Sequence, residues 1–517
     1  MSTHRSFRLS HWTLGAVGAA VLASGLAGDA SAAWPPPESA TCEDLRNSEY
    51  WPNDPDWAPK PGKYNQGKSG AWEFFCFIPE RSQGAPPVRQ GETASGMSID
   101  LAFRYTQGDP RVVIAVLDSG IKWEDADLIE AAYLNIGELK NHKPVNAEGE
   151  PCGGEGELEG FDCNGDGQLT VADYAADPRV TDRNANGVID AGDIILAFSD
   201  GIDDDGNGYI DDISGWDFFK NDNDPYDDTR YGHGTGEARD SVARANNGIG
   251  GVGACPSCRF MPLRVGDSFI TDVNVFADAV IYAADNGAKV VQEALGTINN
   301  SKYAMAALDY AYAKGVTTIA SMADENSRHH NMPAVNNHTL PTHAIAPGPS
   351  EDATSAETFL AFNLCTNYGA HNFLSASSKS CSSGATGMLS GMTGLLYSAG
   401  YKYLVDQGKP GLTAGEVYQL WMMTADDIDV PESRQTPPKY FWSQPGFDQR
   451  FGYGRPNANN AVEWVKAGKI PPEVDIVSPT WYEVLYRDQV EGPVSIKGSV
   501  SAKRAPSYSY YVEAAPG

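Results

Sequence analysis

Residues 111–128 carry the sequence RVVIAVLDSGIKWEDADL, in which an apolar run ends on Asp118 and breaks at once into Ser and Gly. The run predicts a buried strand over residues 112–117. Because Asp, Ser and Gly are common turn residues, one interpretation is a plain strand-ending turn. The alternative is that a buried sheet holds one charged group rigidly, and the rest of the chain must decide between the two.

Strands and helices alternate downstream of this stretch. Residues 277–288 and 301–314 predict helices, whereas residues 289–296 and 315–321 predict strands. This alternation indicates parallel βαβ units, and therefore an α/β fold of three layers with a mainly parallel central sheet. Active groups of such sheets gather at the carboxyl ends of the strands, which is where Asp118 is expected.

The N-terminal sequence indicates export. Arg5 and Arg8 precede a short apolar run, and ASA at residues 30–32 offers a cleavage site, so residues 1–32 predict a signal peptide. No later segment approaches the ~20 apolar residues that a spanning helix needs. We therefore expect a secreted protein, extracellular, periplasmic or at the cell surface, without a membrane span.

The charge of the chain limits its partners. The formal net charge is −30, from 38 basic and 68 acidic residues. Such a surface repels nucleic acid, so we expect no nucleic-acid partner. The sequence indicates no oligomeric state.

Eight cysteines, an even number, favour disulfides in an exported chain. The sequence alone fixes no connectivity, and the CxxC at residues 255–258 is alternatively a redox motif or half of a zinc site. Because the cysteines fall into neighbouring couples, we expect the pairs Cys42–Cys76, Cys152–Cys163, Cys255–Cys258 and Cys365–Cys381.

Changes in composition mark the ends of the chain as distinct segments. Residues 33–47 are expected to form an N-terminal linker. Residues 471–517 alternate as strands do and predict the start of a β-sandwich-like module. So few strands would leave open sheet edges. Either the chain stops inside that module, or its strands pack on the main domain.

Two further motifs accompany Asp118. His233 lies between two glycines in YGHGT, and Ser383 lies in CSSGATGMLSG, where small residues lead into a predicted helix. Alone, the His fits a structural turn and the Ser fits a helix cap. Together they follow one of the known chain orders of a Ser-His-carboxylate triad. Ser would be the nucleophile, His the base that takes its proton, and Asp the group that orients the ring and stabilises the imidazolium.

These motifs resemble those of the subtilisin-like serine peptidases, the subtilases. The resemblance covers roughly residues 48–465, including VVIAVLDSGI, GWDFFKNDNDPYDD before GHGT, and NNGIGGVGACPSCRFMPLRV after it. It implies a subtilisin-like fold and a serine endopeptidase that hydrolyses a protein or peptide substrate through an acyl-enzyme. It places the triad on Asp118, His233 and Ser383, the last chosen because it lies eight residues before Gly391.

The resemblance also assigns the substrate cleft, but the chain departs from the family pattern. Residues 294–296 (Ala294, Leu295 and Gly296) match the strand that lines the cleft, with a plain buried strand as the alternative. Residues 382–387 read SSGATG, whereas the family usually has GTSMAxP. The altered Ser motif, which lacks the proline, favours a subtilase-fold protein with little catalysis, whereas retention of all three triad residue types opposes it.

The most consequential departure concerns the oxyanion hole. The family's side-chain amide donor falls on Asp324, and an ionised carboxylate cannot donate. Loss of one such donor costs roughly 100- to 1000-fold in turnover. Three alternatives remain open: Asp324 is held protonated, Asn326 replaces it, or backbone N–H groups at Ser383 suffice. We expect a working but slow or selective peptidase; the alternatives are a catalytically weak or inactive scaffold protein at the cell surface and a purely adhesive protein.

An acidic insert, residues 150–213, predicts a second chemistry. Residues 162–173 and 182–193 both place oxygen ligands at positions 1, 3, 5 and 12 and Gly at position 6, which is the EF-hand-type Ca²⁺ loop pattern. The pair resembles a dockerin, and we expect it to be chiefly structural. Residues 203–212 begin in the same way but reach Ser214 at position 12, so a solvated acidic turn is the alternative. The predicted metal ligands are Asp162, Asn164, Asp166, Gln168, Asp173, Asp182, Asn184, Asn186, Val188, Asp193, Asp203, Asp205 and Asn207.

Overall fold

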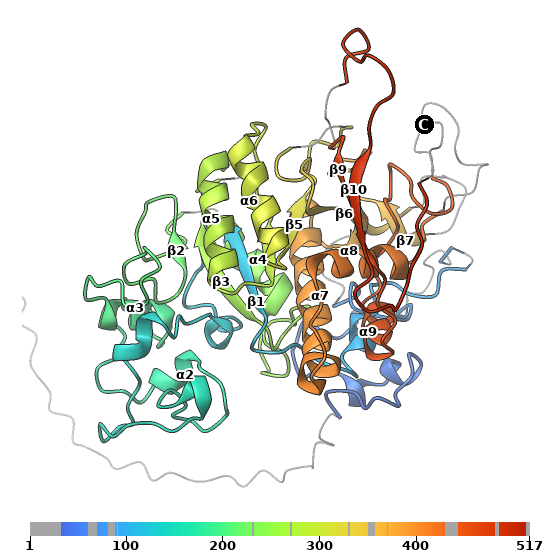
Figure 1. Ribbon diagram of the computed structural model, residues 1–517. Coiled ribbons are helices and arrows are strands. Elements are labelled where there is room, and N and C mark those ends of the chain that lie inside the picture. Colours follow the sequence, from blue (N-terminus) through green and yellow to red (C-terminus); the bar gives the residue numbers. More distant parts are fainter. Residues whose placement is uncertain are drawn as a thin grey trace, which may run out of the picture. The chain divides into compact units, whose positions relative to one another are not determined.

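A computed structural model gives the fold (Figure 1). It describes residues 33–59, 70–80, 88–89, 91–229, 232–268, 271–328, 331–349, 357–369, 371–429, 443–480 and 485–512. The expected signal peptide, residues 1–32, lies outside the described residues. Ala32–Gly517 forms one compact unit. Among the described helices, none combines the length and the apolar character that a membrane crossing requires.

A mainly parallel sheet lies at the centre of this unit. Its strand order is β2-β3-β1-β4-β5-β6-β7, and β8 also pairs with β6. The described pairs are parallel except for β6 with β7, so the predicted sheet type is confirmed. The strands are β1 (Val113–Asp118), β2 (Trp216–Asp217), β3 (Arg259–Arg264), β4 (Val290–Glu293), β5 (Thr317–Ser321), β6 (Thr339–Pro349), β7 (Glu357–Phe362) and β8 (Leu374–Ser377).

Helices cover both faces of the sheet, which completes the three layers. Figure 1 shows α5 and α6 side by side, and α7 runs separately from them. The predicted helices and strands of residues 277–321 are confirmed as α5, β4, α6 and β5. The helices are α1 (Ile99–Ala102), α2 (Val171–Tyr174), α3 (Ala191–Phe198), α4 (His233–Val242), α5 (Val273–Asp285), α6 (Lys302–Ala313), α7 (Ser382–Tyr403), α8 (Ala414–Thr424) and α9 (Ala458–Lys466).

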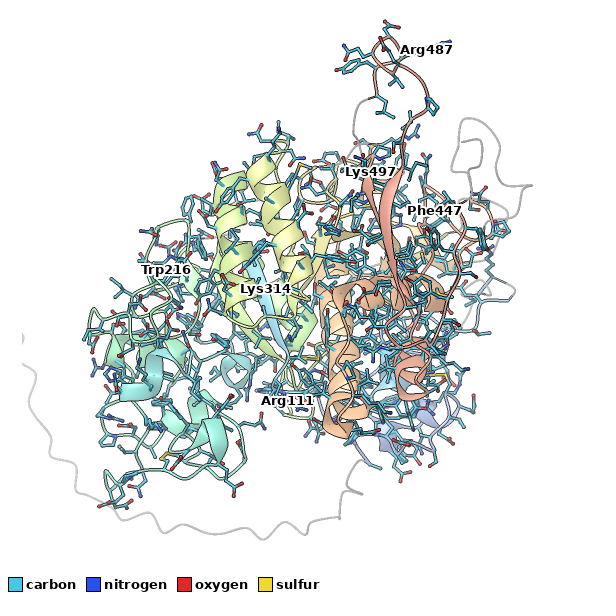
Figure 2. All side chains as sticks on the ribbon, viewed as in Figure 1. Arg111, Trp216, Lys314, Phe447, Arg487 and Lys497 are labelled. Carbon is cyan, nitrogen blue, oxygen red and sulfur yellow. A yellow bond between two sulfur atoms is a disulfide. The ribbon has the colours of Figure 1, made fainter. Side chains whose placement is uncertain are left out.

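β1 is buried on both faces because its side chains alternate between two cores. Ala115 and Leu117 pack in the cluster of α5 and α6, whereas Ile114 and Val116 pack in the larger cluster that includes α4 and α7. This explains the uninterrupted apolar run of the sequence. Arg111, labelled in Figure 2, precedes β1, so Asp118 lies at the opposite, carboxyl end of the strand.

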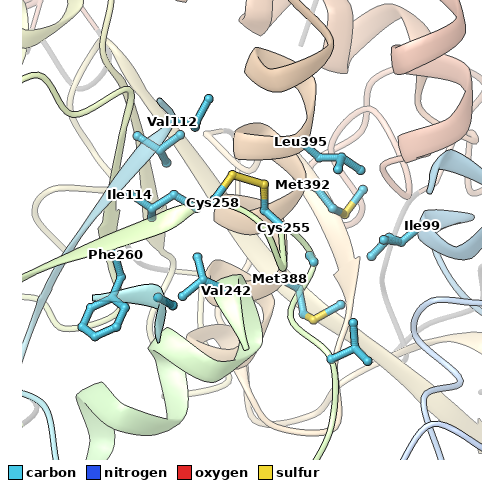
Figure 3. Close-up of a cluster of buried hydrophobic side chains, with 14 of the residues drawn as sticks. Ile99, Val112, Ile114, Val242, Cys255, Cys258, Phe260, Met388, Met392 and Leu395 are labelled. Carbon is cyan, nitrogen blue, oxygen red and sulfur yellow. A yellow bond between two sulfur atoms is a disulfide. The ribbon is translucent and has the colours of Figure 1, made fainter. Parts of the chain in front are cut away.

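α7 packs against α4 at unusually close range because glycines line the contact. A Cβ atom on Gly391 would lie 2.6 Å from the backbone oxygen of Ser241, and one on Gly387 would lie 2.8 Å from the Cβ of Asp240. Figure 3 shows the adjoining core, where Met388 of α7 lies near Val242 of α4. The close contact brings the first turn of α7, which carries Ser383, beside the helix that begins at His233.

Four disulfides join the expected pairs, Cys42–Cys76, Cys152–Cys163, Cys255–Cys258 and Cys365–Cys381. The bond between Cys255 and Cys258 lies in the core shown in Figure 3, so these two residues are neither a zinc half-site nor a surface redox motif. Cys42–Cys76 ties the segment predicted as a linker to the domain.

The C-terminal strands pair with each other and contact the main unit. β9 (Glu473–Ser478) and β10 (Lys497–Ser501) form an antiparallel two-stranded sheet. The side chain of Asn337 donates to the carbonyl of Ile476 at 3.2 Å, and Arg504 pairs with Glu416 of α8 at 2.6 Å. These contacts join the C-terminal sheet to the main unit, and the β-sandwich-like module remains a prediction.

Candidate active site and calcium loops

The sheet and α4 bring Asp118 and His233 together. Asp118 ends β1 and is 1% exposed, and His233 is the first residue of α4. Nδ1 of His233 lies 3.0 and 2.9 Å from the two carboxylate oxygens of Asp118. Asp118 therefore holds the ring by Nδ1, which is the geometry that orients a catalytic imidazole.

Hydrogen bonds between the two motifs explain why their small residues are needed. The backbone N–H of Gly234 donates to the hydroxyl of Ser119 at 3.2 Å, and the N–H of Lys122 donates to the hydroxyl of Thr235 at 2.9 Å. A Cβ atom on Gly234 would lie 2.4 Å from the carbonyl oxygen of Gly120. DSGI and GHGT are thus one interlocked unit rather than two independent turns.

Ser383 is the second residue of α7 and is 7% exposed. Within the described part of the chain, its hydroxyl donates to the carbonyl of Ala294 at 3.3 Å and makes no hydrogen bond with His233. The N–H of Ser383 is among those that a helix start leaves without an intrahelical acceptor. It is therefore available to an oxyanion.

Residues 294–296 follow β4 directly, so the carboxyl end of a central strand leads to Ser383. The side chain of Leu295 is buried in the core with α5 and α6, so only its backbone can face a substrate. The carbonyl of Gly296 accepts from Thr271 at 3.1 Å. A Cβ atom at position 296 would lie 2.0 Å from the amide nitrogen of Asn331, which explains the glycine.

Asp324 lies against the start of α7. One oxygen, Oδ1, accepts from the backbone N–H of Ser382 at 3.0 Å and from its hydroxyl at 2.6 Å. The residue as a whole is exposed, but its carboxyl group packs on protein; desolvation raises the pKa of Asp324, and the Ser382 hydrogen bonds and the charge of His233 oppose this. Asn326 is exposed, and its backbone N–H donates to Cys365 at 3.3 Å.

Two buried carboxyl groups near Asp118 and His233, those of Glu237 and Glu293, were not predicted from the sequence. Glu237 lies one turn along α4, and its Oε1 is 3.6 Å from Nε2 of His233. Burial raises the pKa of Glu237, and the charges of Asp240, Asp118 and Asp324 raise it further. Burial also raises the pKa of Glu293, with Asp118 as the second cause. The sequence signal was the spacing from His233 to Glu237, since residues four apart share a helix face.

The acids around His233 determine its charge. Burial disfavours the imidazolium, but the hydrogen bond and charge of Asp118, with the charges of Glu237 and Asp240, outweigh it and raise the pKa of His233 to about 9. Burial and the charge of Glu73 raise the pKa of Asp240 to about 7, against the charge of Lys379. His233 is thus a stronger base than an ordinary histidine.

The two predicted calcium loops share the hydrogen bonds that their first residue accepts from positions 5 and 6. Asp162, at position 1, accepts from the N–H groups of Gly165 and Asp166 with Oδ1 and of Gly167 with Oδ2, at 2.7, 3.1 and 3.0 Å. In the second loop, Asp182 accepts from Asn186 and Gly187, at 3.0 Å each.

The acids at position 12 close both loops in the same way. Asp173 is buried and accepts from the N–H groups of residues 163 and 164, at 2.9 and 3.3 Å. Asp193 is buried and accepts from residues 183 and 184, at 2.6 and 3.2 Å. Each acid is also part of a capping box, for α2 and α3 respectively.

The atoms of these loops that could bind a metal ion are oxygens, which are the ligands that Ca²⁺ prefers. Asn164 donates to Asp166 at 3.0 Å, so positions 3 and 5 of the first loop meet. Asn184 and Asn186 both donate to Asp190, an acid outside the predicted set of ligands. Two predicted positions offer only backbone carbonyls: Val188 is apolar, and the side chain of Gln168 accepts from Arg259 at 2.7 Å.

The third loop differs from the prediction at its closing position. Asp203 accepts from the N–H groups of residues 206, 207 and 208, as Asp162 does in the first loop. Ser214 instead donates to the carbonyl of Tyr133 at 2.7 Å, outside the loop. Carboxylate oxygens of Glu138, Asp205 and Asp212 lie within 4.8 Å of one another, and Asn207 donates to Asp212 at 2.8 Å. Glu138 comes from a distant part of the sequence, which is why spacing did not reveal it.

Comparison with known proteins agrees with these motifs. The model of the Subtilase family matches residues 109–454. Thermitase of Thermoactinomyces vulgaris is 30% identical over 198 residues, which are 36% of this chain and 68% of thermitase. A probable subtilase-type serine protease of Deinococcus radiodurans is 27% identical over 335 residues, 60% of this chain and 44% of that protein. A thermophilic serine proteinase of Bacillus sp. (strain AK1) is 36% identical over 119 residues, 22% of this chain and 28% of that protein.

Solved structures that match this chain include that of a lanthipeptide protease. Its sequence is 14% identical and its TM-score is 0.42, and the match covers 71% of this chain and 92% of that chain. A protease of Pseudoalteromonas arctica is 16% identical with a TM-score of 0.43, over 80% and 99% of the two chains. The family assignment rests on the sequence match, which covers more than half of the chain. The chain belongs to the subtilase family of serine peptidases.

Proposed function

We propose that the protein is a secreted, calcium-binding serine endopeptidase whose catalytic triad is Asp118, His233 and Ser383. The observation that carries the proposal is the contact of Asp118 with Nδ1 of His233, at 2.9 Å, beside the helix that starts at Ser382 and carries Ser383. The proposed peptidase domain is residues 48–465. Membership of the family supports hydrolysis of protein or peptide substrates.

The reaction follows from the roles of the three groups. Nε2 of His233 takes the hydroxyl proton of Ser383 as its oxygen attacks the scissile carbonyl. The tetrahedral oxyanion accepts a hydrogen bond from the N–H of Ser383, and a second one from Asp324 when that carboxyl group is protonated. His233 then gives the proton to the leaving amine, an acyl-enzyme remains on Ser383, and water activated by His233 hydrolyses it.

Labelling with a fluorophosphonate tests this assignment. The reagent is expected to form one adduct on Ser383, found by mass spectrometry of the digested protein. Ser382→Ala is the matched control and should still be labelled, whereas Ser383→Ala should not. An adduct on Ser382, or no adduct on the folded protein, would overturn the assignment.

A binding or scaffold protein is the second candidate, and two observations favour it. The hydroxyl of Ser383 donates to the carbonyl of Ala294, and Asp324, which the sequence assigns to the position of the usual oxyanion donor, accepts from the N–H of Ser382. A protein of this kind would bind peptides in the cleft without cleaving them. Absence of labelling, together with retained peptide binding by Ser383→Ala, is the result that would favour it.

We also propose that the acidic insert binds Ca²⁺. The equivalent N–H cradles of Asp162 and Asp182, and the shared closure by Asp173 and Asp193, support one ion in each of the two loops. A third site at residues 203–212 is supported by the approach of Glu138 to Asp212. Titration calorimetry of the metal-free protein should give two or three equivalents, and loss of one equivalent in Asp162→Ala would assign the first loop.

Secretion is proposed from the N-terminal sequence. Cleavage after residue 32 should leave Ala33 as the first residue of the protein recovered outside the cytoplasm. N-terminal sequencing checks this, and recovery of the uncleaved chain in the cytoplasm would contradict it. The four disulfides agree with an oxidising compartment.

A further inference from the structure

The imidazole of His233 lies between two carboxyl groups. Asp118 contacts Nδ1 at 2.9 Å, and Oε1 of Glu237 lies 3.6 Å from Nε2. Nε2 is the nitrogen that a Ser-His-Asp mechanism reserves for the serine proton. The serine, meanwhile, hydrogen-bonds to Ala294. Oε1 of Glu237 therefore lies within ion-pair distance of the nitrogen at which the serine proton would be accepted.

Glu237 is buried at a place where a carboxyl group is costly. The residue is 5% exposed, and its Oε2 has no hydrogen-bond partner among the described residues. A buried polar group without partners costs free energy that an apolar side chain of similar size would avoid. No described hydrogen bond involves Oε2. The neighbouring His233 is therefore the remaining explanation for a carboxyl group, rather than an apolar side chain, at this position.

The space for Glu237 comes from a glycine in the helix that carries the proposed nucleophile. A Cβ atom on Gly387, one turn after Ser383, would lie 3.1 Å from Oε2 of Glu237. Residues 382–387 lack the proline of the usual nucleophile motif. The unusual nucleophile motif therefore contacts, through Gly387, the carboxyl group that lies next to His233.

We infer that Glu237 is a positioning residue that binds His233 at Nε2 and sets the charge of the ring, a role that rests on the proposed function of His233 as the general base. Below the midpoint, the imidazolium of His233 and the carboxylate of Glu237 form an ion pair, and the ring cannot accept a proton. Above the midpoint, this proton has been lost to water, so the ring is neutral and can accept the proton of Ser383 at Nε2. The Glu237 carboxylate then stabilises the imidazolium that forms as the serine proton is transferred.

The direction of the pH effect follows from the charges that face this pair. Asp118 comes from β1, Asp240 from α4 and Asp324 from the loop after β5. The negative charge of each of these acids raises the pKa of His233, of Glu237 or of both. Glu73 and Lys379 face Asp240 with opposite charges. A base that must be neutral to accept a proton works above its pKa, so Glu237 moves the onset of activity to higher pH. Because His233 and Glu237 titrate together, the measured pH midpoint is a property of the pair and not of His233 alone.

Proton NMR of the histidine rings tests the inference without using activity. The chain has nine histidines, and His233→Gln identifies the resonance of His233. An opposite charge within about 4–6 Å shifts a pKa by about 1–3 units, so Glu237→Gln should lower the His233 midpoint by at least about one unit. Glu237→Asp keeps the charge and should restore part of the shift.

Matched controls separate this effect from a general loss of charge. Glu463→Gln makes the same chemical change on α9 and should leave the His233 midpoint in place. Asp118→Asn should lower the midpoint, which shows that the resonance responds to the site. An unchanged midpoint in Glu237→Gln, with a shifted one in Asp118→Asn, would overturn the inference.

The pH dependence of kcat/KM extends the test to the enzyme. The acid limb should move to lower pH by about one unit in Glu237→Gln, which makes the variant more active than the wild type below neutral pH. If neither protein cleaves peptides but the NMR midpoint moves, the proposed function fails while the pairing of Glu237 with His233 stands. If both cleave peptides with superimposable profiles, the proposed function stands and the inference fails.

Discussion

Replacing Asp324 with Asn is expected to raise turnover, although the residue contacts the first turn of the helix that carries Ser383. Oδ1 of Asp324 accepts from the backbone N–H and the hydroxyl of Ser382. The Asn oxygen can accept the same two hydrogen bonds. The change therefore converts only the other carboxylate oxygen into an NH₂ group, a donor where a negative charge repels the oxyanion.

The gain can be estimated from the value of one oxyanion donor. Such a donor is worth roughly 100- to 1000-fold in kcat. Asp324 is exposed, and water screens part of the effect, so we expect a gain of roughly 10- to 100-fold, or about 1.4–2.7 kcal/mol in the activation free energy.

The gain should also depend on pH. A protonated Asp324 can donate, and partial desolvation raises its pKa. The wild type therefore has its donor in acid and loses it as the pH rises through that pKa. The ratio of Asp324→Asn to wild-type kcat should be smallest in acid and should grow toward neutral pH.

Hydrolysis of a peptide p-nitroanilide, measured from about pH 5 to about pH 9, provides the assay. Glu325→Gln removes one negative charge at the adjacent residue without adding a donor at Asp324, and Asn326→Ala removes the alternative donor. Both should remain within a few-fold of the wild type. A fall, or no gain, in Asp324→Asn would refute the missing-donor account, and a large loss in Asn326→Ala would identify Asn326 as the donor instead.

Three further predictions concern stability. Gly391→Ala should lower the free energy of unfolding by about 1–3 kcal/mol because its methyl group meets the backbone of Ser241, whereas Gly236→Ala, in open space on α4, should raise it by about 0.5–1 kcal/mol; urea unfolding measures both. Chelation of Ca²⁺ that was present at about 100 times its Kd should lower the free energy of unfolding by about 2.7 kcal/mol for each occupied site, in Glu157→Gln as in the wild type, but by one site less in Asp162→Ala; an unchanged melting temperature would contradict structural calcium. Removal of the Cys42–Cys76 disulfide, which spans 34 residues, should cost about 3–4 kcal/mol, seen as a lower urea midpoint in the double Ser variant; equal midpoints would show that this segment adds no stability.

Local patterns predicted most of the α/β framework. β1, α5, β4, α6 and β5 have apolar side chains at strand or helix periods, and the structure places them within a few residues of the expected positions. These elements are long and regular enough for periodicity to identify them. The disulfide pairs followed because each joins cysteines that are near neighbours along the chain.

The environment of the site could not be predicted in the same way. Periodicity places Glu237 on α4 but does not reveal that α7 approaches closely enough to bury it. That approach depends on Gly387, which lies far along the chain from Glu237. Glu138 approaches Asp212 only through the folding of the insert. Such contacts arise from tertiary packing, and spacing in one segment carries no information about them.

The acidic insert lies in the sequence between Asp118 and His233, two residues of the proposed triad. Asp118 and His233 are 115 residues apart in sequence, and the acidic loops occupy much of the interval. Closing a flexible loop becomes less costly as it shortens, by about 0.6 kcal/mol for each halving of its length. A chain in which the insert has already folded has a shorter flexible path to close. With the proposed calcium sites in the insert, we expect the speed at which the unfolded polypeptide regains its central sheet to depend on the ions of the refolding medium. Magnesium or a chelator in place of calcium should slow that recovery before any difference in the folded protein can be seen.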